Sequence, residues 1–404
     1  MYDLIVIGSG AAGIIASIKA ARDGKRVLLL EKLSSLGPKL KATGGGRCNL
    51  TNTLENEDFM KSFGRNGKFM RDALYEFDSN DLIAFFKKLG VDTHAPDGFH
   101  IFPTTHNSTT IIKGLEAELK RLNVTVMFNQ NVQNIFIEDN RVQGVQTQSG
   151  KYHSENVLIA TGGQGYPTLG TTGDGYEMAQ DLGHKVSELY PAMLPLLTEE
   201  KWVANCRADT IAKATMKIDL PKYKKVQAVG DLIFTNSGIR GPVVLDFARE
   251  ITPLVAKLGK VPIVVNFSQL NEEQLREHFK KYSELSILKT LQKLFPQSFI
   301  IEICKIVNID ETSNITRYSG QIRDEFFKLL TWTPLTIIGS DGFEKAMVTR
   351  GGVSLKEVDP KSMKSKIIDG LYFAGEVLDL DGPCGGYNLQ WSFSSGYLAG
   401  KLMV

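Results

Sequence analysis

The sequence predicts an α/β fold in which one discontinuous domain is interrupted by a β-rich segment and a helical segment. Three observations indicate this. Residues 3–31 read as a buried strand, a helix and a second buried strand. The chain closes with another buried strand, "LYFAGE", and a helix from about 389 to 402. These closing elements need a sheet to join, and the N-terminal one is available.

Residues 3–31 contain the local signals of a first βαβ unit. "DLIVI" at 3–7 is a β-branched run typical of a buried parallel strand, and Gly8 ends it. The segment from Ala11 to Asp23 has apolar residues at helical spacing, and Gly24 is its stop signal. "RVLLLE" at 26–31 then predicts the second buried strand.

The α/β pattern continues to about residue 185. We expect mainly helix over 57–90 and a clearer helix over 108–122. Residues 124–160 predict strands, with a hairpin that turns at Asp139 and Asn140 and a last buried strand that ends at Ala160.

The two prolines of "LYPAMLPLL" then suggest an exit from the first domain. Strands dominate to about 268, centred on "QAVGDLIFTNSGIRGPVVLDF", and "NEEQLREHFKKY" begins a helical part on an Asn N-cap. We expect three domains: the first over 1–190 and 345–404, a β-rich, barrel-like insertion over 191–268 and 331–344, and a helical insertion over 269–330.

Composition and charge indicate which classes of protein and partner to expect. Of 404 residues, 42% are hydrophobic and 23% charged, and the net charge of +2 gives no global reason to expect nucleic acid or a membrane as partner. The four cysteines form no C-x-x-C pair, which argues against a zinc site or a disulfide framework and favours a reducing cytoplasm. We find no signal peptide and no stretch of membrane-spanning length.

Residues 8–13, "GSGAAG", match G-x-G-x-x-G between a strand and a helix. In that place Gly8 makes the tight turn, Gly10 lets the backbone approach a pyrophosphate, and Gly13 allows close helix packing. The helix N-terminus supplies N–H groups for phosphates. Glu31, at the end of the second strand, can bind ribose hydroxyls and disfavours a 2′-phosphate, so NADP fits this site poorly. The alternative is a plain turn with Glu31 as a surface charge.

Two further signals favour FAD over NAD as the resident dinucleotide. "LIATGGQG" ends a buried strand in glycines, and a later strand ends at Gly375 and Glu376 before the last helix opens near Asn388. An acid at a strand end and a helix N-terminus just after it could serve the ribityl hydroxyls and the pyrimidine edge of a flavin. A cofactor touched by both ends of the chain is long, which favours FAD.

Several strings then resemble a known family. "TGGGRCNLTN" at 43–52, "ATGG" and "AGEVLDLDGPCGGYNLQWSFSSG", with the N-terminal motif, resemble the HI0933-like flavoproteins, a group that includes an aminoacetone oxidase and a bile-acid reductase. The resemblance covers essentially the whole chain. It implies an FAD-binding domain interrupted by a β-rich and a small helical domain, which agrees with the organisation predicted above.

The resemblance also implies which residues contact FAD. These are Gly8, Gly10, Ala12, Gly13, Glu31, Lys32, Lys39, Thr43, Gly44, Gly45, Gly46, Arg47, Cys48, Asn49, Val132, Ala160, Thr161, Gly162, Gly375, Glu376, Asn388, Leu389 and Gln390. One departure is visible in "FTNSGIRGP", where the family pattern has a histidine at Asn236 and a serine at Arg240. If these positions face the substrate, we expect a substrate different from that of family members with the usual histidine and serine.

The catalytic residue is open. A dithiol relay is excluded because Thr53 stands where a second cysteine would follow Cys48. Cys48 is either a lone redox thiol or a small residue packed near the cofactor. Arg47 could bind an anionic substrate or stabilise reduced flavin, or it could be a structural contact.

Three histidines, His94, His100 and His106, lie close together in sequence without metal-site spacing, and we expect no metal. They are loop residues, or one of them is a proton donor. "VTRGGV" at 348–353 reads as a turn close to the flavin.

We therefore expect an FAD-dependent oxidoreductase that transfers a hydride through flavin N5 between a small organic substrate or NAD(P)H and an acceptor. Only one nucleotide motif is present, so NAD(P)H either binds transiently as electron donor or is not the donor. Oxidase and reductase remain open, as does the oligomeric state. The alternative is a flavin-binding redox sensor or an FAD-dependent nucleic-acid-modifying protein, for which "LPKYKK" is only modestly basic.

Overall fold

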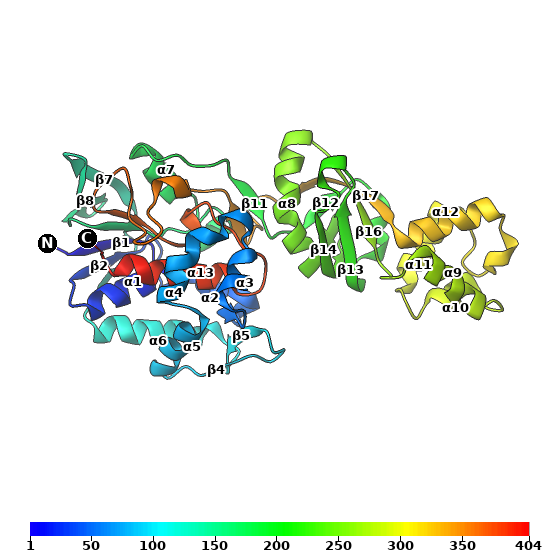
Figure 1. Ribbon diagram of the computed structural model, residues 1–404, viewed down its shortest axis with the longest axis horizontal. Helices are drawn as coiled ribbons and strands as arrows, with labels where there is room; N and C mark the ends of the chain where they lie inside the picture. The colour runs from blue at the N-terminus through cyan, green and yellow to red at the C-terminus, as the bar shows by residue number, and fades with distance from the viewer. Residues whose placement is uncertain (404) are drawn as a thin grey trace. The chain divides into compact units, whose positions relative to one another are not determined.

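The computed structural model describes residues 1–403, which divide into two compact units (Figure 1). The first unit comprises Met1–Tyr190 and the chain from Val348 onward, and the second comprises Pro191–Met347. The predicted α/β class is confirmed, since the structure contains a parallel sheet, a closed barrel and helices. The further boundaries expected at 268 and 331, inside the second unit, stay predictions.

A five-stranded parallel sheet lies at the centre of the first unit, in the order β19-β10-β1-β2-β6. Its strands are β1 (Leu4–Ile7), β2 (Val27–Leu30), β6 (Thr125–Met127), β10 (Val157–Ile159) and β19 (Leu371–Phe373). Val157 pairs with Leu371, so the closing strand completes the N-terminal sheet, as predicted. Every residue of β1, β2 and β19 is buried, as strands covered on both faces must be.

Helix α1 (Ala11–Arg22) follows β1 and packs against the closing helix α13 (Tyr387–Gly400), as Figure 1 shows. A Cβ added at Gly396 would lie 2.3 Å from the Ala12 carbonyl oxygen, so this crossing depends on glycine. The other helices of the unit are α2 (Pro38–Ala42), α3 (Asn56–Lys61), α4 (Arg71–Glu76), α5 (Ser79–Lys88), α6 (Ser108–Arg121) and α7 (Asp174–Asp181). Helices α3 to α6 occupy the two segments for which the sequence predicts helix.

Two small antiparallel sheets complete the first unit. One has the order β3-β5-β4 and is made of β3 (Thr51–Asn52), β4 (Thr93–His94) and β5 (His100–Pro103). The other contains β7 (Val132–Glu138), β8 (Arg141–Thr147) and β9 (Gly150–His153). The hairpin between β7 and β8 turns at Asp139 and Asn140, as predicted, and both have positive φ. Strands β11 (Tyr190–Ala192) and β18 (Val348–Arg350) lie where the chain leaves and re-enters this unit.

The second unit contains a closed six-stranded barrel in the order β12-β15-β14-β13-β16-β17. Its strands are β12 (Leu196–Thr198), β13 (Thr210–Ile218), β14 (Gln227–Phe234), β15 (Gly238–Arg240), β16 (Val261–Asn266) and β17 (Thr333–Ser340). Ala214, Met216 and Ile218 are buried at alternate positions of β13, which is the period of a strand with one face on a core.

One prediction for this unit is wrong. "PVVLDF" was expected among the strands, but it opens helix α8 (Pro242–Leu258). The β-branched Val243 and Val244 favour a strand locally. Pro242 nevertheless sits at the first turn, where a helix tolerates it, and the buried positions continue at helical spacing through Phe247 and Ile251.

Four more helices follow β16, namely α9 (Glu272–Lys281), α10 (Ile287–Leu291), α11 (Gln297–Ile306) and α12 (Gly320–Thr331). The predicted Asn271 N-cap is confirmed, because Asn271 and Gln274 form a capping box. Short 3-10 segments are η1 (Thr43–Gly46), η2 (Gly64–Met70), η3 (Pro167–Leu169), η4 (Lys201–Cys206), η5 (Pro221–Tyr223), η6 (Ile315–Arg317), η7 (Leu355–Glu357) and η8 (Gly375–Val377). Within residues 1–403, every helix is too short or too polar to cross a membrane.

Candidate cofactor site

The turn between β1 and α1 contains three glycines of the motif. At Gly8 and Gly13 the surrounding atoms leave no room for a side chain, whereas at Gly10 they do. Gly8 has φ +100°, and a Cβ there would lie 2.7 Å from the Ala160 carbonyl oxygen. A Cβ at Gly13 would lie 1.9 Å from the Gly8 carbonyl oxygen. At Gly10, by contrast, φ is −74° and an added Cβ meets no atom within 4 Å. Packing therefore accounts for Gly8 and Gly13, whereas the bare backbone at Gly10 leaves space for another group.

Glu31 lies directly behind this turn. Its Oε2 accepts hydrogen bonds from the Ser9 N–H at 2.9 Å and the Ser9 hydroxyl at 2.6 Å, and its Oε1 accepts one from the Leu33 N–H at 2.8 Å. A carboxylate has about four acceptor positions, so these three bonds leave room for a ribose hydroxyl. Because α1 begins at Ala11 with no side-chain cap, its first N–H groups are also available for a phosphate.

Lys39 and Glu376 form the second part of the site. Lys39 Nζ lies 2.9 Å from Glu376 Oε2, and the Thr349 N–H donates to Glu376 Oε1 at 2.9 Å. A Cβ at Gly163 would come within 2.6 Å of Glu376 Oε1, so the strand end after β10 lies against this carboxylate. The contacts bring together segments near residues 39, 163, 349 and 376.

The predicted contacts at the ends of β10 and β19 lie near the glycine turn. The Ala160 N–H donates to the Ile7 carbonyl at 2.9 Å, and a Cβ at Gly375 would lie 3.0 Å from Ala12 Cβ. The Thr161 hydroxyl is buried without a hydrogen-bond partner among residues 1–403. Because a buried polar group normally has a partner, this orphaned hydroxyl is consistent with a ligand contact.

The glycine loop of residues 43–49 is the third part. Gly44, Gly45 and Gly46 all have positive φ, which the three glycines permit without strain. The Cys48 N–H donates to the Thr43 carbonyl at 3.0 Å and closes the loop. With its amide oriented to satisfy both ends, the Asn49 side chain donates to the Thr51 carbonyl at 3.1 Å and accepts from the Gly386 N–H at 3.2 Å. The loop is thus tied to the segment that precedes α13.

Cys48 is fully buried in this loop. Burial raises the pKa of its thiol to about 12, against a smaller lowering by a hydrogen bond with Thr43. A thiol with that pKa carries almost no thiolate at neutral pH and is a poor nucleophile. Of the two alternatives for Cys48, the packed residue agrees with this environment.

Arg47 is exposed and lies over an aromatic ring. Its guanidinium carbon is 5.1 Å from the centroid of Phe102, and its Nε donates to the Gly44 carbonyl at 3.3 Å. The side chain therefore has a structural contact, and its remaining N–H groups are available to a ligand. Phe102 is a residue that sequence reasoning missed, because nothing in the chain order signals this contact.

Other predicted contacts have partners inside the protein. Lys32 Nζ lies 2.7 Å from Asp174 Oδ2, and the Gln130 N–H donates to the Glu31 carbonyl, which brings the start of β7 at Val132 close to Glu31. The Asn388 side chain bonds the Gly382 backbone at 2.8 and 2.9 Å, and Leu389 beside it is half-buried.

Gln390 is buried, and its amide donates to the Phe77 carbonyl and the Ser394 hydroxyl. Its side chain thus points into the core, and its backbone N–H donates to the Gly386 carbonyl at 3.0 Å. Asn236 and Arg240 lie in the second unit, both exposed, at the β14–β15 hairpin.

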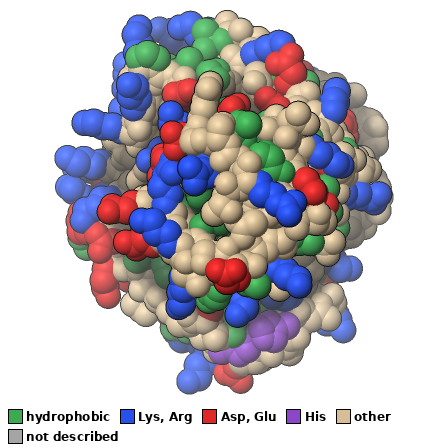
Figure 2. All heavy atoms as spheres, turned by 90° about the vertical axis from the view of Figure 1, so that its right-hand side faces the viewer, with side chains coloured by type: hydrophobic (Ala, Val, Ile, Leu, Met, Phe, Trp, Pro, Cys, Tyr) green, Lys and Arg blue, Asp and Glu red, His purple; other side chains and the backbone are tan. Residues whose placement is uncertain are grey.

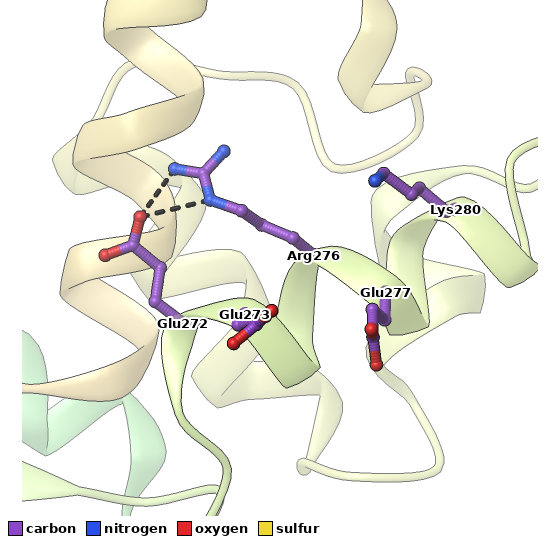
Figure 3. Close-up of a pocket in the computed structure, with 5 residues that line it drawn as sticks. All are labelled: Glu272, Glu273, Arg276, Glu277 and Lys280. Atoms are coloured by element: carbon purple, nitrogen blue, oxygen red, sulfur yellow. Dashed lines mark hydrogen bonds and ion pairs between the residues drawn. The ribbon is translucent and has the colours of Figure 1, made fainter.

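A separate hollow in the second unit differs in its lining from the predicted cofactor site. A hollow of about 370 Å³ is lined by one stretch of α9, as Figure 3 shows: Glu272, Glu273, Arg276, Glu277 and Lys280. Arg276 is held there by Glu272 and Asp324, each at 2.6 Å. No group of three or more His, Cys, Asp or Glu side chains in residues 1–403 is placed to hold a metal ion.

The parallel sheet, the glycine turn and the acid after β2 define a Rossmann-type dinucleotide-binding protein. Comparison with known sequences gives the particular family. The profile described as "HI0933-like protein Rossmann domain" matches residues 2–402, and the chain belongs to this family of FAD-dependent oxidoreductases. The resemblance inferred from "TGGGRCNLTN" and its companion strings is thereby confirmed.

Named relatives are similar over their full lengths. The 3-dehydro-bile acid delta(4,6)-reductase of Clostridium scindens is 31% identical over 98% of this chain and 97% of its own. The ribosomal RNA dihydrouridine synthase of Haemophilus influenzae is 30% identical over 97% of this chain and 96% of its own. Because a relative is named for acting on RNA, the expectation that nucleic acid is not a partner is unsupported.

Solved structures share the fold. A flavocytochrome c3 fumarate reductase superposes with a TM-score of 0.52 at 18% identity, over 99% of this chain and 77% of that one. The 3-ketosteroid-delta4-(5alpha)-dehydrogenase of Rhodococcus jostii superposes with a TM-score of 0.52 at 16% identity, over 99% and 96%. These likenesses support the flavoprotein fold and carry nothing about the substrate.

Proposed function

We propose that this protein is an FAD-dependent reductase that delivers a hydride to a carbon–carbon double bond conjugated with a carbonyl group. The names of two full-length relatives support the bond type. A Δ4 bond beside a 3-oxo group is a conjugated enone, and dihydrouridine forms by saturation of a uracil C5–C6 bond conjugated with the C4 carbonyl. The two substrates differ greatly in shape but share this reacting group.

The observation that carries the flavin part is the open backbone at Gly10 in front of Glu31. We assign the N-terminus of α1 to the pyrophosphate and Glu31 to the adenosine ribose, since the first offers unpaired N–H groups and the second an unused acceptor position. Lys39, Glu376 and the 43–49 loop are assigned to the flavin half, because their contacts join the other predicted segments. Bound FAD would supply hydride transfer at N5.

Reduction of the double bond places a hydride on one carbon and a proton on the other, so each turnover consumes two electrons from a donor. We propose NAD(P)H as that donor. The sequence contains one G-x-G-x-x-G turn, and we assign this turn and Glu31 to the resident FAD. NAD(P)H would therefore bind only transiently, without a Rossmann domain of its own. Arg47 is the candidate for substrate contact, since its guanidinium is exposed beside the glycine loop.

A redox sensor based on a flavin-adjacent thiol is less well supported. Such a sensor needs an accessible, low-pKa cysteine. Cys48 is buried with a pKa raised to about 12, and burial raises the pKa values of Cys206 and Cys304 to about 12 as well. The exposed Cys384 lies on the segment before α13.

The test separates the two half-reactions under anaerobic conditions. NADH or NADPH is added to the FAD-loaded protein and bleaching of the flavin band is followed. A 3-oxo-4-ene steroid or a uridine-containing RNA is then added to the reduced protein. We expect bleaching by a nicotinamide and recovery with a conjugated substrate, but no recovery with its saturated analogue. Bleaching by an amine, with recovery only in air, would instead indicate an oxidase.

A further inference from the structure

Two exposed planar side chains contact one buried ring beside the glycine loop: the Arg47 guanidinium lies over the Phe102 ring, and the His106 ring is tilted by 40° to it. The Arg47 guanidinium is 5.1 Å from the Phe102 centroid, and the His106 ring is 5.9 Å from it. Phe102 is only 7% exposed, whereas Arg47 and His106 are both exposed. Phe102 therefore contacts two planar groups that both belong to exposed residues.

Both planar groups are held in place by contacts of their own. Arg47 Nε donates to the Gly44 carbonyl, and the backbone N–H of His106 donates to the Pro103 carbonyl at 2.9 Å. His106 has φ +48°, a conformation uncommon outside glycine, and the His94 ring packs 4.5 Å from it. The left-handed backbone at His106 and the neighbouring His94 ring restrict how the imidazole can turn.

This cluster lies next to the loop that we assign to the flavin. A Cβ added at Gly44 would lie 3.6 Å from the Phe102 ring and 3.0 Å from the Asn49 backbone nitrogen. Strand β3, which follows the loop, pairs with β5, which carries Phe102. A ligand on the exposed faces of Arg47 and His106 would therefore be close to whatever the glycine loop holds.

We propose that Arg47 and His106, supported by Phe102, form a stacking platform for a uracil base of an RNA substrate. The proposal rests on the proposed function and names its substrate class. Nucleobases that enzymes modify are taken out of the helix stack, and proteins bind them on aromatic rings and Arg guanidinium planes. The platform offers one group of each kind.

The charges around the platform suit a polyanion. Lys41 is exposed on the same stretch, and its carbonyl accepts a hydrogen bond from Ser108, two residues after His106, at 2.6 Å. The nearby acid, Asp97, is bonded to His100 Nδ1 at 2.5 Å. A steroid, by contrast, buries best against aliphatic walls, which this surface of arginine and histidine does not provide.

The test measures RNA binding without any redox step. A fluorescent oligouridylate is titrated with the protein in the presence and absence of FAD, against a probe of the same length with abasic sugars. We compare Arg47→Lys, which keeps the charge and removes the plane, with His106→Asn, which tolerates positive φ and removes the ring. Arg26→Lys is the matched control, since Arg26 precedes the first residue of β2, whereas the cofactor site lies at the other ends of the strands, and it pairs with Asp3.

We expect each platform variant to weaken oligouridylate binding about tenfold, the usual order for loss of one stacked base, and the abasic probe to bind equally weakly to all proteins. The control should match the wild type. Unchanged affinity in both platform variants, or equal affinity for the abasic probe, would overturn the platform. Binding of a 3-oxo-4-ene bile acid without oligouridylate binding would overturn it as well. Loss of flavin uptake or reducibility would contradict only the proposed function.

Discussion

Lys39 Nζ lies 2.9 Å from Glu376 Oε2 and joins two residues that are 337 positions apart in the chain. Both side chains are largely buried, with exposed fractions of 21% and 16%. The ion pair connects the segment after β2 to the segment after β19, and Thr349 adds a backbone hydrogen bond to the same carboxylate. It links both ends of the chain within the first unit.

A double-mutant cycle tests this ion pair. We expect Lys39→Met and Glu376→Gln each to lower the free energy of unfolding of the flavin-free protein, with a coupling on the order of 1 to 2 kcal/mol because the pair is shielded from water. Urea denaturation of the four proteins measures it. The Lys61–Asp58 pair, with exposed fractions of 75% and 60%, is the control and should show a coupling near zero. Equal couplings for the two pairs would contradict the shielding.

Glu31→Ala should weaken FAD binding. The substitution removes the acceptor for a ribose hydroxyl, and a charge-assisted hydrogen bond contributes about 1.5 to 3 kcal/mol. It also releases the Ser9 hydroxyl and N–H from their partner. Titration of the apoprotein with FAD measures the affinity, and Ser9→Ala, which keeps the carboxylate, should lose less. Affinity equal to the wild type would show that Glu31 does not hold the ribose.

The four cysteines should differ sharply in reactivity. Cys48, Cys206 and Cys304 are buried with raised pKa values, whereas Cys384 is exposed. A colorimetric thiol reagent at neutral pH should therefore titrate one thiol in the folded protein and four after denaturation. Cys384→Ser should abolish the folded-state signal. Rapid labelling of Cys48, located by peptide mapping, would contradict its burial.

Glu118 should make stability depend on pH. The Arg121 and Arg22 guanidinium groups bond this buried carboxylate and lower its pKa to about 2. A lowered folded-state pKa stabilises the protein above the unfolded value, and this stability is lost as pH falls from about 4.5 towards 2. We expect Glu118→Gln to cost about 2 to 3 kcal/mol at neutral pH.

The difference between wild type and Glu118→Gln should shrink once pH falls below the ordinary carboxyl range, as urea denaturation at several pH values would show. The exposed Glu116 lies on the same helix, and Glu116→Gln should change little at any pH. A Glu118→Gln effect that does not vary with pH would mean that the carboxylate charge is not its source.

Local signals were sufficient for most of the first unit. A β-branched run, a glycine turn and an amphipathic segment determine β1 and α1 without help from the rest of the chain. The barrel helix α8 was missed because Val243 and Val244 favour a strand locally, and only packing over the whole segment decides for a helix.

Side-chain partners far apart in sequence were beyond prediction. Glu31 is a recognisable position, but its bond to Ser9 spans 22 residues, and the bond from Thr349 to Glu376 spans 27. The contact of Arg47 with Phe102 likewise depends on the pairing of β3 with β5, for which the sequence offers no signal. These contacts arise from the tertiary fold, which short-range patterns do not encode.

The most direct test of the cofactor site is an FAD titration of Gly10→Val. An added Cβ at Gly10 meets no protein atom within 4 Å and φ is −74°, so the variant should fold with wild-type stability while its side chain fills the space assigned to the pyrophosphate. Gly320→Val, where an added Cβ also meets nothing, is the control. We expect one FAD per chain in the wild type and the control and none in Gly10→Val. A folded Gly10→Val that binds FAD like the wild type would contradict the site.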